Sequence, residues 1–381
     1  MMTGSRRDDQ GATTVLVALL LSGVMVGLLA LGSTTGNLVW ERRQLQNSAD
    51  ATSLKLAQTC ALKLSDCDAG AAAASLEALG DLNANDASQA LDGAGRSDTV
   101  LGQCGRVPGA PNMPLCDSGN PSMPAADIAD LRQCPPLPTW LQGNAIKYVE
   151  TYTRSESADG PFVRFLFADG QTAVHSCARA AWGVPTNAAV LPFTLSDCEW
   201  DDATNSGTVY GVETALPLKY KDKTYCGGVV GRDYDGGFGW LLHGSGMCEV
   251  EVDKNSWVEG DQGMGKGTDC MHLLPVGATI LIPIFDCYSQ TKVLPCVTSD
   301  KPHGVYHIKA YGAFTITGYK LPSKTETSGV GSTAMSRCSS DFANGKHCLF
   351  GKFVKALVQE AEIDPDPTAE DFGAQVVKVA G

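Results

Sequence analysis

The sequence lacks closely spaced cysteines. It holds 14 cysteines in 381 residues, yet no C-x-x-C occurs anywhere in it. Zinc ribbons, iron–sulfur sites and thioredoxin-type redox pairs require such spacing, so these sites are not expected. An even number of separated cysteines instead predicts up to seven disulfides, formed in an oxidising compartment. The candidates are Cys60, Cys67, Cys104, Cys116, Cys134, Cys177, Cys198, Cys226, Cys248, Cys270, Cys287, Cys296, Cys338 and Cys348.

Charged and aromatic residues are also few. Charged residues make up 19% of the chain and aromatic residues 7%, and the net charge is −13. A chain this acidic does not present a general surface for nucleic acid or anionic lipid, so we expect no nucleic-acid partner. Its length is sufficient for one large or two modest domains.

Complete catalytic motifs are missing as well. The segment GDQGMGKGT at 260–268 begins like a phosphate-binding loop, but Gly267 stands where Ser or Thr would hold magnesium. The HGSG segment at 243–246 lacks the first glycine of a nucleophile elbow. Since no nucleophile–base pair or paired carboxylates complete a motif, we expect a protein that is not an enzyme and uses no cofactor.

Metal-binding spacings are incomplete too. His303 and His307 lie in a segment that reads as a strand, where residues four apart are separated by about 13 Å and cannot share one ion. The carboxylates at 233–235 and those of Asp201 and Asp202 are of the type that binds calcium, but no EF-hand glutamate follows. Ordinary turns are the favoured interpretation, and no metal is expected.

One long stretch has no charge at all. No charged residue falls between Asp9 and Glu41, and Val15–Leu31 is almost wholly aliphatic. A helix over Gly11–Leu31 would be roughly 30 Å long, which matches the hydrocarbon core of a bilayer. We therefore predict a single membrane span. A signal peptide cleaved near Ser33, or pilin-type cleavage after Gly11, are the alternatives.

Glycines recur at intervals of four within and after the predicted span. Small residues at this spacing let two helices approach closely in lipid, although glycine is common in membrane helices for other reasons. The candidate helix-packing residues are Gly23, Gly27, Gly32 and Gly36.

The helix is predicted to continue beyond the membrane, to residue 66. Leu38, Leu45, Ala49, Leu56 and Ala57 fall on one face of such a helix. Cys60 lies in the last part of this segment and Cys67 directly after it, and the two would be about 10 Å apart on a continuous helix. Either the helix ends between them or each bonds elsewhere.

The remaining chain changes character twice. An Ala/Gly/Pro-rich segment with turn formers precedes runs of alternating β-branched and aromatic residues. The predicted fold is α+β: a long N-terminal transmembrane and juxtamembrane helix, then a β-rich, disulfide-stapled, sandwich-like domain. The expected parts are a cytoplasmic tail at 1–11, the helix at 12–66, a cysteine-containing linker subdomain at 67–138, the β-rich domain at 139–359 and an acidic tail at 360–381 with a short strand over AQVVKV.

The N-terminal segment resembles the TadE/TadG-like membrane segment of the Flp (tight adherence) pilus-assembly system. Both have a basic tail, a glycine, an apolar helix and then an aliphatic–ERR–LQN–ADA run. The juxtamembrane motif residues here are Trp40, Glu41, Arg42, Arg43, Leu45, Gln46, Asn47, Ala49 and Asp50. This chain has Ser33-Thr34-Thr35 where the family often carries an Asp, and it lacks the metal-binding triplet of relatives with a von Willebrand type A domain.

Further strings resemble the extracellular part of actinobacterial TadG-like proteins. They are CARAAWGVPT at 177–186, LPFTLSDCEW at 191–200, GGFGWL at 236–241 and ILIPIFDC at 280–287. The resemblance implies a non-enzymatic, single-pass protein of the cell membrane whose bulk is extracellular. Its implied partners are the lipid bilayer and other pilus-assembly membrane proteins or pilin-like subunits. The alternative is a secreted or anchored binding module or cell-wall-acting enzyme with a cleaved signal peptide.

Overall fold

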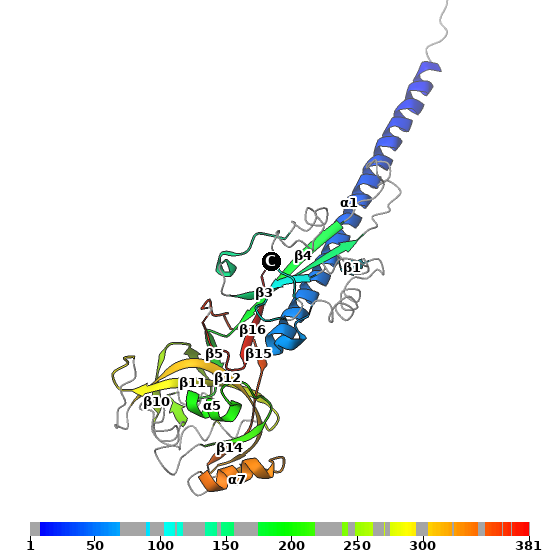
Figure 1. The fold of residues 1–381 in the computed structure, drawn as a ribbon. Coiled ribbons are helices and arrows are strands. Elements are labelled where there is room, and N and C mark those ends of the chain that lie inside the picture. Colours follow the sequence, from blue (N-terminus) through cyan, green and yellow to red (C-terminus); the bar gives the residue numbers. More distant parts are fainter. Residues whose placement is uncertain are drawn as a thin grey trace, which may run out of the picture.

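The computed structural model contains a long helix, two larger sheets and one small sheet (Figure 1). It describes residues 8–68, 89–91, 103–110, 113–116, 134–142, 146–155, 174–217, 238–242, 248–261, 270, 275–294, 304–321, 324–341, 347–359, 361–366 and 368–380. The observed class is α+β with β-rich sheets and several disulfides, as the sequence predicts.

Helix α1 covers Asp8–Leu62, a length of roughly 80 Å at 1.5 Å per residue. Figure 1 shows its N-terminal half extending alone, away from the other elements, while its C-terminal half lies beside the strands. The helix stops four residues before the predicted end at 66, and a 3-10 turn, η1 (Leu64–Asp66), follows. The chain turns back there, so that Cys60 and Cys67 form a disulfide with their Cα atoms 4.5 Å apart. Of the two alternatives, the helix therefore ends between the cysteines.

The first sheet packs against the C-terminal half of α1. Its strand order is β1 (Gln89–Leu91), β3 (Lys147–Ser155), β4 (Val174–Gly183), β16 (Ala374–Val379) and β15 (Ala356–Val358), and β2 (Gln103–Arg106) also pairs with β3. β3 and β4 pair antiparallel over their whole length. β16, the last of the described strands, pairs antiparallel with the edge of β4 that β3 leaves open.

The contact between α1 and this sheet is made of small and aliphatic side chains. Leu56 and Ala57 are fully buried in one cluster with Val149 of β3 and Ala180 of β4. Leu45 and Ala49 are fully buried on the same helix, which confirms the predicted face except at Leu38, whose side chain lies outside the described residues. Residues three and four apart share one side of a helix, so this stripe is what fixes α1 on the sheet.

The second sheet closes on itself. Its path is β10 (Trp257–Asp261), β8 (Phe238–Leu241), β6 (Phe193–Ser196), β11 (Thr279–Ser289), β12 (Val305–Lys320), β14 (Cys348–Val354) and β7 (Glu213–Pro217), with β13 (Thr325–Glu326) beside β12. Because β10 also pairs with β12, the path from β10 through β8, β6 and β11 to β12 forms a ring. This closed ring differs from the sandwich-like arrangement expected.

The length of β12 explains the closure. One edge of β12 pairs with β11, while the other edge pairs first with β10, through Val305–His307, and then with β14, through Ala313–Lys320. Register shifts in both β11 and β12 mark bulges, which bend strands and increase their twist. The long bent strand β12 can thus belong to the ring and also pair with β14, which lies outside the ring.

Aromatic side chains fill one side of the ring. Tyr306 contacts Phe285 and Tyr288, with ring centroids 4.9 and 4.8 Å apart. A Cβ at Gly239 would lie 2.2 Å from the Tyr306 ring, so the absence of a side chain on β8 leaves space for this tyrosine. Close packing of this kind requires glycine at that position.

Short elements complete the second part of the chain. They are η2 (Thr139–Leu141), the pair of β5 (Asn187–Val190) and β9 (Val250–Asp253), helix α5 (Asp197–Thr204) and helix α7 (Ser332–Asp341). The Ser196 hydroxyl caps α5 by accepting a hydrogen bond from the Glu199 backbone N–H.

The C-terminal segment connects the two larger sheets. The region expected as an acidic tail buries Ala361, Ile363 and Phe372 and provides β16, which contains the predicted AQVVKV strand. The Trp200 indole N–H of α5 donates to the Phe372 carbonyl at 3.2 Å. This segment is therefore part of the packed core.

We expect Leu56→Ala to lower the free energy of unfolding by about 2–5 kcal/mol, because it leaves a cavity between α1 and β3–β4. Leu242→Ala is the matched control, since Leu242 is half exposed and its loss should change stability by less than about 0.5 kcal/mol. Chemical denaturation of the purified variants would measure both. Equal stabilities would contradict docking of α1 on the sheet.

Candidate functional site

The exposed half of α1 is the first candidate site. Its large apolar side chains are 53–72% exposed, namely Val15, Leu16, Val17, Leu19, Leu20, Leu21, Val24, Met25, Val26, Leu28 and Leu29. A continuous apolar surface of this kind marks an interaction site. Within the described residues, no helix combines the length and the apolar character needed to cross a membrane.

The predicted packing glycines lie on this half and just after it. A Cβ built at Gly23, Gly27, Gly32 or Gly36 would meet nothing within 4 Å. The chain therefore leaves the space at these four positions open, and a role in contact between helices stays a prediction.

The juxtamembrane motif divides into two parts. Trp40 is 54% exposed, and Arg42 and Arg43 are also exposed, whereas the side chain of Glu41 lies outside the described residues. Leu45, two residues after Arg43, is completely buried. The motif thus spans the point at which α1 passes from its exposed half to the half that the sheet covers.

Gln46 connects the motif to the sheet by hydrogen bonds. Its side-chain N–H groups donate to the Asp50 carboxylate at 3.0 Å and to the Cys177 carbonyl at 3.1 Å. Its side-chain oxygen accepts from the Ser176 hydroxyl. On the neighbouring strand, the Thr153 hydroxyl donates to the Leu45 carbonyl at 3.1 Å. Hydrogen bonds require defined geometry, so these contacts set the register of the helix on the sheet.

A buried ion pair lies in the same sheet. Glu150 accepts from the Arg179 guanidinium, with distances of 2.7 Å to Nε and 2.6 Å to Nη2, and both side chains are almost inaccessible. The Tyr152 hydroxyl donates to the second oxygen of Glu150 at 2.5 Å. Burial, together with the Glu150 carboxylate, raises the pKa of Tyr152 above its ordinary value, so the phenol stays a donor.

Sequence reasoning did not find this pair. Glu150 and Arg179 are direct cross-strand partners in the β3–β4 register. The sequence gives little signal for this pair, because Glu150 shares its strand with Lys147 and Arg154 and with several hydroxyl residues. The two residues meet only when β3 pairs with β4, and a long segment separates these two strands in the sequence.

Two disulfides surround Glu150. They join Cys104 to Cys116 and Cys134 to Cys177. Among the described residues, the groups of three or more potential metal ligands are these two cysteine pairs, each with Glu150. Cysteines in disulfides offer no thiolate, so the arrangement fits covalent cross-links rather than an ion.

The predicted use of cysteines in disulfides is confirmed in the described residues, none of which is a free cysteine. Besides the bonds already given, Cys248 bonds to Cys270 and Cys338 to Cys348. Cys198 and Cys287 are disulfide-bonded too. Cys226 and Cys296 lie outside the described residues.

The residues considered above as metal ligands or phosphate-binding residues make ordinary structural contacts wherever the structure describes them. His307 Nδ1 lies 2.6 Å from the Asp286 carboxylate on the adjacent strand, and Asp202 of α5 pairs with Arg337. Gly260 belongs to strand β10, and 262–268 lies outside the described residues, as do His303 and 233–235.

Comparison of the chain with protein-family models, with curated proteins and with solved structures finds no match.

We expect Gln46→Leu to lower the free energy of unfolding by about 1–3 kcal/mol, because the Ser176 hydroxyl and the Cys177 carbonyl lose their partner in a partly buried place. Asn47→Leu is the control, since Asn47 is exposed on the next position of the helix. Hydrogen exchange should report faster opening of α1 amides around 45–57 in the first variant alone. Identical exchange in both variants would contradict the assigned role of Gln46.

Proposed function

We propose that this chain is a non-enzymatic, membrane-anchored structural or assembly protein whose C-terminal bulk lies outside the cytoplasm. The observation that carries the proposal is the division of α1 into an apolar half that nothing in the described chain covers and a half that the sheet buries.

The exposed half requires an apolar environment. Transfer of aliphatic surface from water is favourable by about 25 cal/mol per Å², so a row of half-exposed leucines and valines is unfavourable in water. The described side chains of this half run from 14 to 29, and the apolar stretch of the sequence extends from 12 to 31. We infer that a bilayer provides this environment, since about 20 apolar residues can span a hydrocarbon core and a helix satisfies its own backbone hydrogen bonds.

The cysteines support the orientation. All 14 follow the apolar stretch in the sequence. Disulfides form and persist outside the cytoplasm, so the sheets would lie on the extracellular side and the first residues on the cytoplasmic side. Trp40 and the two arginines after it would then lie at the membrane surface, where amphipathic and charged side chains are favoured.

The pilus assignment rests on the resemblance of the N-terminal segment to TadG-like proteins. In this proposal the motif through Asp50 holds the anchor helix to the exported sheets, and the open glycines contact pilin-like subunits or other assembly proteins in lipid. The chain would act by presenting or anchoring its extracellular part, with no chemical step.

Leu20→Arg should weaken membrane association, because an arginine near the centre of the span costs about 2.5–3.5 kcal/mol. Val212→Arg is the matched control, since Val212 is exposed outside α1. Alkaline extraction of membranes followed by sedimentation measures the fraction retained. Complete release of the native chain would overturn the anchor.

The mature N-terminus separates the anchored protein from its alternatives. Intact mass of protein from native membranes should show a start at Met1 or Met2. A start at Ala12 would instead indicate pilin-type processing and incorporation into a fibre. A start near Ser33 would indicate a secreted domain and contradict the proposal.

Gly23→Leu and Gly27→Leu should each reduce crosslinking of the span to its partners at least several-fold, because a leucine at these positions prevents close approach of helices. Val26→Leu is the control, since it adds bulk beside these glycines without filling their space. Photo-crosslinking in native membranes measures the effect. Unchanged crosslinking in both glycine variants would exclude this packing face.

A further inference from the structure

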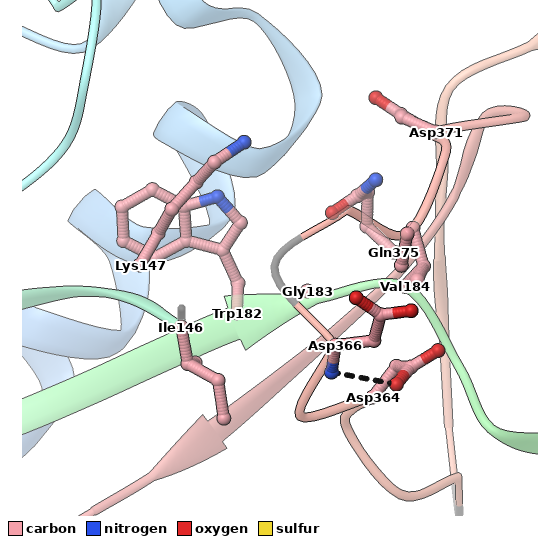
Figure 2. Close-up of a pocket in the computed structure, with 10 residues that line it drawn as sticks. Ile146, Lys147, Trp182, Gly183, Val184, Asp364, Asp366, Asp371 and Gln375 are labelled. Carbon is pink, nitrogen blue, oxygen red and sulfur yellow. Dashed lines mark hydrogen bonds between the residues drawn. The ribbon is translucent and has the colours of Figure 1, made fainter. Parts of the chain in front are cut away.

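A pocket lies where the first sheet meets the segment before β16. Its cavity is about 70 Å³, room for several water molecules at ~10–15 Å³ each. Its polar lining comes from Lys147, Trp182, Asp364, Asp366, Asp371 and Gln375. Figure 2 shows the lysine and the tryptophan on one side and the three aspartates on the other.

Gln375 is the residue that points to a ligand. Its side chain is 5% exposed, and it has no hydrogen-bond partner among the described residues. In Figure 2 its amide group extends toward the side on which Trp182 lies, and no dashed line reaches it. The amide nitrogen and oxygen of Gln375 are not among the fully buried polar atoms that lack a partner, so both reach the open space of the pocket and can bind a molecule that accepts and donates hydrogen bonds.

The opposite side of the pocket offers further donors. Trp182 is 2% exposed, and Figure 2 shows the nitrogen of its indole on the side that faces the aspartates. Lys147 is exposed at the rim. In the described part of the chain neither side chain has a hydrogen-bond or ion-pair partner.

The carboxylates are acceptors whose charge is partly balanced. Asp364 pairs with Lys254 at 2.5 Å and Asp371 with Lys355 at 2.9 Å. One oxygen of Asp366 accepts from the Thr368 hydroxyl and backbone N–H, which lowers the pKa of this exposed carboxyl, and its other oxygen has no such bond. The three do not converge on one point, because no described group of three acids brings its oxygens within 4.8 Å. A coordinated cation is therefore not the favoured occupant.

We propose that this pocket binds a single sugar residue. Each sugar hydroxyl can donate to an Asp366 or Asp371 oxygen and accept from the Gln375 amide or the Trp182 indole. A lone anion would be repelled by the aspartates, and a lone cation would leave the donors unpaired. A ring with several hydroxyls can satisfy both sets of groups at once.

Saturation-transfer difference NMR can test this proposal on the full-length chain in a detergent without sugar head groups. The probes are the methyl glycosides of glucopyranose, mannopyranose and galactopyranose. At least one should give a saturable signal. Gln375→Leu and Asp366→Asn should each weaken that binding about tenfold or more, whereas Glu251→Gln, an exposed acid on β9 that does not line the pocket, should leave it unchanged.

Three results would overturn the proposal. They are no signal from any of the three glycosides, binding unaffected by either pocket variant, and binding of Ca²⁺ alone that the same variants abolish. Asp366 is exposed, so Asp366→Asn decides the question even if Gln375→Leu unfolds the chain. Membrane extraction is a separate measurement, and its outcome does not depend on this one.

Discussion

The close packing of α1 on β3 and β4 fixes the long helix on the first sheet. It depends on small residues, because Ala57 on the helix and Ala180 on the strand let the two backbones come together while Leu56 and Val149 fill the remaining space. Polar bonds from Gln46 and Thr153 then define one register along the helix axis. Without this contact, a helix roughly 80 Å long would have no fixed relation to the sheets.

Side chains along β3 and β4 alternate between the face of the sheet that α1 covers and the opposite face. Val149, Thr151 and Thr153 face the helix, whereas Tyr148, Glu150 and Tyr152 face the other way and carry the ion pair with Arg179. Removing one partner of a buried pair leaves a charge uncompensated, which costs about 3–5 kcal/mol. The two neighbouring disulfides hold this polar layer covalently, which limits the ways in which it can open.

Local patterns in the sequence predicted the long helix, its buried face and the use of cysteines in disulfides. These depend on periodicity and count, which a sequence displays directly. The closed ring was not predicted, because it depends on β10 pairing with a strand that begins more than forty residues later. The pocket escaped notice for the same reason, since Trp182 and Gln375 stand on neighbouring strands but far apart in the chain. The Glu150–Arg179 pair likewise exists only once β3 and β4 are joined.

The orientation of α1 has a mechanical consequence. A pull between its free half and the closed ring acts along the helix axis, as its direction in Figure 1 indicates. Such a load shears the whole contact between helix and sheet at once, instead of peeling it one residue at a time. The Cys60–Cys67 bond lies at the far end of that contact and fastens the last turn of the helix to the chain that follows. The joint is thus arranged to resist traction along one direction, that of the helix itself.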